Sequence, residues 1–114
     1  MTATDKPLVW VSGRIATPPL STEARHKAGR LLRTLQRGNF LAFPDSRPMP
    51  SVGRRCHELR IGEVAGSWRI MYRIDHDAVV VVDAFVKKTR KTPQRIIDEC
   101  RRRLRRYDDT SNEE

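Results

Sequence analysis

Four segments of the chain have the hydrophobic pattern of β-strands. They lie at residues 8–11, 56–61, 67–74 and 78–85, and are rich in strand-forming residues or alternate between hydrophobic and polar positions. The last of them differs from the others because it is apolar on both faces. We therefore expect it to be a central strand that is covered on both sides of the sheet.

Two other segments have the three- and four-residue spacing of an amphipathic helix. The first begins after Ser21, a favourable N-cap, and ends before Gly38, a favourable C-terminal stop. The second follows Thr92, which is predicted to be its cap, and Pro93, a residue favoured in the first helical turn. Its apolar stripe runs as far as Tyr107.

The order of these elements predicts a single α+β domain over residues 1–107. A strand and a helix are followed by three antiparallel strands and a closing helix. We expect a small antiparallel sheet of about four strands, packed with an N-terminal helix and a C-terminal helix. Residues 108–114 are acidic and are predicted to form a short disordered tail.

A long connection, residues 38–53, separates the first helix from the next strand and contains three prolines. Connections of this length inside a small domain are often functional or mobile. Phe40, Leu41 and Phe43 are its apolar residues, and we expect them to fold back onto the core.

The composition adds a strong positive charge to this picture. The 114 residues include 23 Lys and Arg against 14 Asp and Glu, for a formal net charge of +9. Such a charge favours a nucleic acid or an acidic protein as partner. The longest apolar run, residues 78–82, is too short to span a membrane, and the N-terminus lacks the apolar segment of a secretory signal. We therefore expect a cytoplasmic protein without membrane contact.

The residue types that most often bind metals are few and scattered. The chain has two cysteines, Cys56 and Cys100, and three histidines with no ligand spacing between them. The cysteines are predicted to be small buried residues, and His57 falls on the core face of its strand, as a structural histidine would. We expect no metal site and no cofactor.

Residues 85–93 carry four cations and no acid, between an apolar strand and the second helix. These cations are Lys87, Lys88, Arg90 and Lys91. Like charges that are packed together repel one another, so the local fold gains nothing from them. An external polyanion such as RNA explains them best, and a solvated basic turn is the alternative.

Alternation along residues 56–61 and 67–74 places a second group of charges on the face opposite the core. The residues of this face are Glu58, Arg60, Arg69, Met71 and Arg73. Arg60 and Arg69 are then cross-strand neighbours, which is destabilising unless both are solvated or an anion lies between them. Because the next strand brings two lysines to the same end of the sheet, we predict a phosphate site built on rigid strands. The alternative is a half-covered face with the arginines at its rim.

Three motifs in this part of the chain carry a family resemblance. They are the Glu-Leu-Arg of residues 58–60, the Arg-x-x-Tyr of residues 69–72 and the Phe-x-Lys-Lys-x-x-Lys-Thr-Pro of residues 85–93. With these motifs the chain resembles the RelE/HigB superfamily of bacterial toxins, and within it the phage-derived HigB-like branch. The resemblance covers residues 8–107 in the order of elements, is most specific in the last third, and implies a RelE-like fold.

The resemblance also implies a function, that of the toxin of a type II toxin–antitoxin system. Such a toxin is an endoribonuclease that cuts mRNA on the ribosome. It uses no metal: the ribose 2′-OH attacks the adjacent phosphate and leaves a 2′,3′-cyclic phosphate. The implied partners are mRNA, the ribosome and a cognate antitoxin, which we expect to be a helix-turn-helix protein from the adjacent gene.

This chemistry needs a base for the 2′-OH, cations for the phosphorane and a proton for the leaving oxygen. Arg60 and Arg69 suit the phosphorane because a planar guanidinium matches phosphate oxygens. Candidate bases are Glu58 and three lysines whose pKa values neighbouring cations would lower. The candidate lysines are Lys87, Lys88 and Lys91. Alternation does not choose among them, because their strand is apolar on both faces. Further RNA contacts are expected from Arg73, Arg90 and Arg95.

Two other functions fit the same residues. A non-catalytic module that binds RNA or DNA would use the same basic patch and would need no group with a shifted pKa. A phage-encoded adaptor would use the patch to bind an acidic host protein. The lack of an obvious His or Glu pair is one point in favour of the non-catalytic module.

Overall fold

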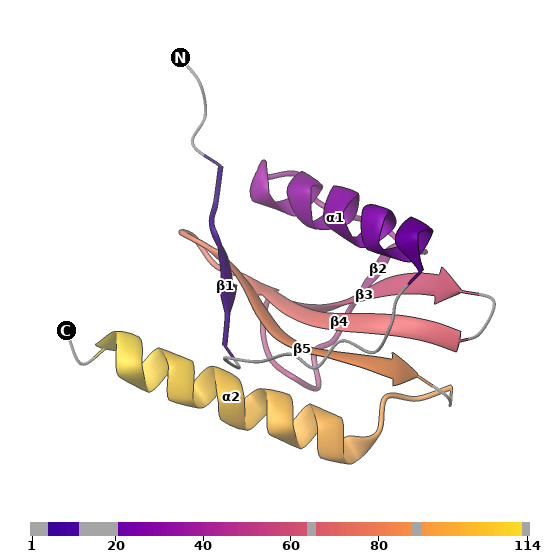
Figure 1. Ribbon diagram of the computed structural model, residues 1–114. Coiled ribbons are helices and arrows are strands. Elements are labelled where there is room, and N and C mark those ends of the chain that lie inside the picture. Colours follow the sequence, from indigo (N-terminus) through magenta and orange to yellow (C-terminus); the bar gives the residue numbers. More distant parts are fainter. Residues whose placement is uncertain (1–4, 12–20, 64–65, 88–89, 113–114) are drawn as a thin grey trace.

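The computed structural model describes residues 5–11, 21–63, 66–87 and 90–112 (Figure 1). In chain order its elements are β1 (Leu8–Trp10), α1 (Thr22–Gln36), β2 (Ser46–Pro48), β3 (Cys56–Glu63), β4 (Gly66–Ile74), β5 (Val79–Lys87) and α2 (Gln94–Asn112). They follow the predicted order, and β2 is an addition that lies inside the predicted connection. The predicted site residue Lys88 lies outside the described residues.

Five strands form one sheet in the order β1-β5-β4-β3-β2. β1 runs parallel to β5, whereas the other neighbouring strands are antiparallel. The predicted α+β class is therefore confirmed. The sheet differs from the expectation in being mixed and in having five strands rather than about four. The additional strand arises because Arg47 and its neighbours in β2 pair with the outer edge of β3.

The two helices lie on opposite faces of the sheet (Figure 1). α1 packs against the face that carries Leu59 and Tyr72, whereas α2 packs against the face that carries Met71 and Val80. β5 lies between β1 and β4, and its valines contribute to both clusters. The prediction of a central strand covered on both sides is therefore confirmed.

The predicted boundaries of α1 are confirmed by the residues at its two ends. The Ser21 hydroxyl accepts a hydrogen bond of 3.0 Å from the Ala24 N–H, which is the geometry of an N-cap. Gly38 has a φ of 89°, in the left-handed region that glycine adopts after a helix.

The start of α2 differs from the prediction. The N–H groups of Ile96 and Ile97 donate to the carbonyl oxygen of Pro93, at 3.0 and 3.2 Å, so the helical turn begins at this proline. Thr92, which was predicted to cap the helix, directs its hydroxyl to a carboxylate of the sheet instead. Thr92 therefore belongs to the candidate site that is described below.

The end of α2 also differs from the prediction. The helix continues to Asn112, so residues 108–112, which were expected to belong to a disordered tail, are helical. Asp108 forms an ion pair of 2.7 Å with Arg73 of β4, and this contact joins the last turns of the helix to the sheet. The buried stripe of α2 is therefore supplemented by a polar contact that the acidic composition alone did not reveal.

A register shift in the β4–β5 pair decides which residues of β5 face α2. The pairing shifts between Met71 and Tyr72, which leaves Val82 as an extra residue of β5. Val81 packs toward α1, and strict alternation from it would point Lys87 toward α1 as well. Because of the extra residue, Lys87 lies on the α2 side of the sheet instead.

The connection between α1 and β2 does not pack as predicted. Leu41 is partly buried against the α1 side of the core, but Phe40 and Phe43 are 85% and 71% exposed. The reason is that β2 draws the chain to the outer edge of β3, where the Arg60 N–H donates to the Asp45 carbonyl at 2.8 Å. The expectation that both phenylalanines fold back onto the core was therefore wrong.

Candidate active site

A single carboxylate lies at the centre of the basic face of the sheet. The Glu58 residue is 0% exposed, and its Oε1 atom lies close to three cationic groups. These are Arg47 Nε at 3.2 Å, Arg69 Nε at 3.4 Å and Lys87 Nζ at 3.5 Å. The other oxygen, Oε2, accepts a hydrogen bond of 2.6 Å from the Thr92 hydroxyl. We call these five residues the Glu58 cluster.

Each member of the Glu58 cluster comes from a different segment. Arg47 lies on β2, Glu58 on β3, Arg69 on β4 and Lys87 on β5, and Thr92 precedes α2. Arg47 is the direct cross-strand partner of Glu58, so their side chains share one face of the sheet. Groups that are held on paired strands keep fixed positions, which is what a site for one defined anion requires.

The Glu58 cluster is closed to solvent except at one member. The Arg47 side chain is 36% exposed, whereas those of Arg69 and Lys87 are 8% and 5% exposed. Three cationic groups face one carboxylate, so the cluster has an excess of positive charge. Buried charges persist only when they are paired, and removing one partner is costly. The excess of positive charge makes the cluster a candidate site for a second anion. Such an anion would enter beside Arg47, the most exposed member of the cluster.

Burial also affects the acidity of the cations in the cluster. The pKa of Lys87 is lowered, first because burial disfavours the charged ammonium and then because Arg47 and Arg69 repel it, while Glu58 acts in the opposite direction. Burial likewise lowers the pKa of Arg69, although a guanidinium stays protonated in proteins. Lys87 is therefore the member of the cluster that is best suited to exchange a proton.

Arg60 lies beside the Glu58 cluster and has a different neighbour. As predicted, it is the cross-strand partner of Arg69. The two guanidinium groups have different partners. Arg69 pairs with Glu58, whereas the Arg60 guanidinium lies over the Phe43 ring, 5.0 Å from its centroid. In the free protein, the Glu58 carboxylate thus compensates the charge of Arg69, whereas Arg60 packs on the Phe43 ring.

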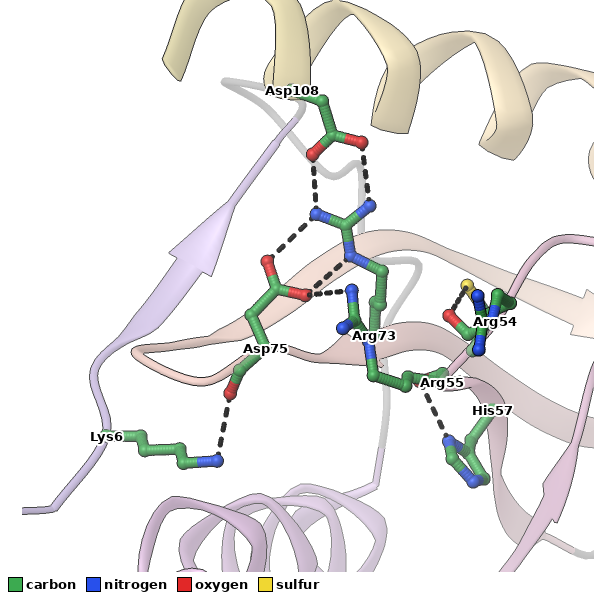
Figure 2. Close-up of polar contacts among 8 residues, drawn as sticks. Lys6, Arg54, Arg55, His57, Arg73, Asp75 and Asp108 are labelled. Carbon is green, nitrogen blue, oxygen red and sulfur yellow. Dashed lines mark hydrogen bonds and ion pairs between the residues drawn. The ribbon is translucent and has the colours of Figure 1, made fainter. Parts of the chain in front are cut away.

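Arg73 belongs to a separate network at the other end of β4 (Figure 2). Its guanidinium donates two hydrogen bonds to Asp75, at 2.7 and 2.9 Å, and two to Asp108, at 3.0 and 2.7 Å. The bonds to Asp108 are the main reason why the pKa of Arg73 is raised. Met71, which is 0% exposed, lies between Arg73 and Arg69 along the strand. The geometry makes Arg73 a link between the sheet and α2, and its predicted contact with RNA stays a prediction.

The remaining predicted residues lie around the entry to α2. Arg90, Lys91 and Arg95 are exposed at the surface there. The structure thus brings together three predicted site residues, Glu58, Arg69 and Lys87, and places Arg60 beside them.

Sequence reasoning missed two members of the Glu58 cluster. Arg47 lies in a three-residue strand within the proline-rich connection, where no periodic pattern indicated a strand. Thr92 was considered only as a helix cap. A signal for Thr92 was present, because it directly follows the lysines of the basic stretch, but its hydroxyl meets Glu58 only through the tertiary fold.

Other kinds of site find little support in the part of the chain that the structure describes. Its residues include no group of three or more His, Cys, Asp and Glu that could hold a metal ion. Neither described helix combines the length and the apolar character that crossing a membrane requires. Both cysteines are buried, and burial raises the pKa of Cys56 to about 11 and that of Cys100 to about 12, so neither is an activated thiol.

Comparison with known proteins gives one family. Residues 19–105 match the family described as "Phage derived protein Gp49-like (DUF891)". The matched residues include all five members of the Glu58 cluster and both helices up to the last turns of α2. No curated protein matches the chain.

Proposed function

Because the chain belongs to the Gp49-like family of phage-derived proteins, which is toxin-like, we propose that it is the toxin of a type II toxin–antitoxin system and cleaves mRNA on the ribosome. The Glu58 cluster is the observation that carries this proposal. It holds two guanidinium groups and one ammonium group around a single point, on four paired strands. Groups of this kind stabilise the charge that develops on a phosphate under attack.

In the proposed reaction, an RNA phosphate enters the Glu58 cluster as a second anion and contacts its cations beside the Glu58 carboxylate. The ribose 2′-OH attacks the neighbouring phosphorus, a base removes the 2′ proton, and the P–O5′ bond breaks as the leaving oxygen takes up a proton. The phosphorane is stabilised by Arg69, Arg47 and Arg60, because one guanidinium group can donate two parallel hydrogen bonds to two phosphate oxygens. The products are a 2′,3′-cyclic phosphate and a free 5′-OH.

Lys87 is the base that the observations favour, because its pKa is lowered by burial and by the nearby arginines. Glu58 is the second candidate, and Lys88 and Lys91 stay open as predictions. The side chains of Lys87 and Glu58 are only 5% and 0% exposed in the free protein, so RNA must open the cluster. Arg47 is the member that moves most easily, since it is the most exposed.

The proposed toxin acts in the cytoplasm and needs an antitoxin there, because free activity would arrest the host. We propose a helix-turn-helix protein from the adjacent gene, whose acidic groups cover the basic face. The closed state of the Glu58 cluster also fits a second function, a binding module that never cleaves. In that case the internal carboxylate would only keep the cations in place for nucleic acid.

We expect the purified protein to cut single-stranded RNA, free or as mRNA on programmed ribosomes, and to leave cyclic or 3′-phosphate ends. On free RNA the cleavage should survive EDTA, because the cations of the cluster do the work that a metal would otherwise do. A second RNA, with a single 2′-deoxy nucleotide at the mapped cleavage position, should stay intact there. Gel mapping and end analysis by mass spectrometry give both results.

The outcomes separate the candidate functions. RNA that is bound but not cut, free or on the ribosome, would support the binding module. Neither binding nor cleavage would contradict both nucleic-acid functions and leave the adaptor for an acidic host protein. Cleavage that EDTA abolishes and magnesium restores on free RNA would contradict the proposed mechanism, as would cutting at the 2′-deoxy position.

The cleavage rate should rise with pH and level off at a pH below the ordinary pKa of a lysine side chain. The sign follows from the mechanism, because a base must lose its proton before it can act and the pKa of Lys87 is lowered. Lys87→Arg is the sharpest variant, since it keeps a positive charge next to Glu58 but cannot deprotonate. It should lose this pH dependence and most of the rate, measured as kcat/KM after subtraction of uncatalysed hydrolysis. A Lys87→Arg protein with the wild-type profile would exclude Lys87 as the base.

A further inference from the structure

Two large aromatic side chains are strongly exposed, and one of them contacts Arg60, the residue beside the Glu58 cluster. Phe40 and Phe43, on the connection between α1 and β2, are 85% and 71% exposed. Phe43 is in contact with the site face, because the Arg60 guanidinium lies over its ring at 5.0 Å from the centroid. The ring is therefore covered by a cation on one face and is otherwise open to a second flat group.

The position of Phe43 relative to the Glu58 cluster follows from the strand register. Arg60 lies two residues from Glu58 on the same face of β3, a distance of about 7 Å along the strand. It is also the cross-strand partner of Arg69. The Arg60 side chain, with the Phe43 ring against it, therefore lies beside the Glu58 cluster, next to Glu58 and Arg69.

The backbone around Phe43 is fastened to the sheet. The carbonyl of Asp45 accepts a hydrogen bond of 2.8 Å from the Arg60 N–H, and the Asp45 N–H donates to the Ala42 carbonyl at 3.0 Å. The Asp45 carboxylate also pairs with Lys27 of α1 at 3.7 Å. Phe43 is thus presented from a turn with fixed ends, so its exposure is a property of the fold.

We propose that Phe43, stacked on Arg60, is a platform for an unpaired nucleobase of single-stranded RNA, next to the phosphate that enters the Glu58 cluster. This inference rests on the proposed function. Proteins that bind single-stranded nucleic acid combine cations for the backbone with exposed aromatic rings for the bases. Because every base has a flat π-face, such a platform favours no particular base.

The surroundings of the ring favour a nucleobase over an apolar side chain of another protein. Phe43 adjoins Arg60, which lies beside a cluster with excess positive charge, in a chain of net charge +9. A ligand for this place must be flat and apolar at the ring and anionic a short distance away. A nucleotide has both properties in one unit, whereas an apolar side chain satisfies only the first.

The test compares two single-stranded 2′-O-methyl oligonucleotides of equal length, one with bases and one abasic throughout. Neither can be cut, because the 2′-OH is blocked, and both carry the same phosphates. In fluorescence anisotropy titrations, Phe43→Ala should bind the base-containing strand about 5- to 150-fold more weakly than the wild type does, the range that loss of one stacked base produces. Its affinity for the abasic strand should not change, because Arg60 and the Glu58 cluster are intact.

Three further variants make the comparison specific to a stacked ring. Phe43→Trp keeps an aromatic face and should retain the affinity for the base-containing strand. Phe43→Leu keeps apolar bulk without a ring and should lose affinity as Phe43→Ala does. Phe40→Ala is the matched control: it removes the same atoms from the same connection at a residue with no described cation over its ring, so its effect should be smaller than that of Phe43→Ala. Thermal melts confirm that each variant folds, as expected for residues this exposed.

The outcomes distinguish a failure of this inference from a failure of the proposed function. If the wild type binds and cuts RNA but Phe43→Ala binds both strands as the wild type does, or binds both more weakly by the same factor, the platform is wrong and the proposed function stands. The first of these results is also the one expected if the ring serves a protein partner. If the wild type binds neither strand and cuts no RNA, the proposed function fails and the inference fails with it.

Discussion

Replacing Glu58 with alanine should lower the free energy of unfolding by about 3–5 kcal/mol, the cost of breaking a buried ion pair by removing one partner. Arg69 and Lys87, with side chains only 8% and 5% exposed, would lose the carboxylate that compensates their charges. Urea unfolding at neutral pH, followed by circular dichroism, measures the difference.

Two other variants serve as controls for this result. Glu58→Gln keeps the shape of the side chain and can still accept the Thr92 hydrogen bond, so it should cost less than Glu58→Ala. Arg47→Ala removes a pair whose cation is 36% exposed, and should cost about 1 kcal/mol or less. If Glu58→Ala were as stable as the wild type, the cations would not depend on Glu58 and the cluster would not be the closed unit described above.

Replacing Arg69 with lysine should slow RNA cleavage by about 10²–10³-fold while the protein stays folded, because one preorganised donor to the phosphorane is lost. Lysine keeps a positive charge near Glu58 but lacks the planar fork that binds two phosphate oxygens. Single-turnover cleavage and thermal melting should be measured on the same preparations.

The choice of lysine at this position comes from the structure. From strand alternation alone, Arg69→Ala should cost little stability. The observed burial of Arg69 and its contact with Glu58 indicate a larger cost, which would obscure an effect on rate. The same substitution at Arg102, which pairs with Glu99 on the outer face of α2, is the matched control and should change neither quantity. An Arg69→Lys protein with the wild-type rate would remove Arg69 from the reaction.

Local patterns sufficed for much of this fold. The caps of α1, the buried face of β3 and β4 and the double burial of β5 follow from residues that are close in sequence. For the same reason, alternation correctly placed Arg60 opposite Arg69. It also placed Glu58 on their face, because the side-chain period of a strand is a local property.

Features that depend on contacts between distant segments could not be predicted in this way. The exposure of Phe40 and Phe43 depends on β2, a strand whose three residues pair only because the edge of β3 is available. Arg47 reaches Glu58 through the same pairing. Neither hydrophobic period nor propensity indicates so short a strand, since its stability comes from its neighbour.

The sequence by itself determined the helices, four of the five strands, the face on which the arginines gather and the net charge of +9. These depend on backbone preference and side-chain period, which act over a few residues. Only the tertiary structure decided that Glu58, rather than an outside anion, lies among the cations, and that Lys87 joins them. The extra residue in β5 reverses the alternation and turns Lys87 toward Glu58. A bulge arises in the pairing of two strands, so alternation along one strand does not reveal it.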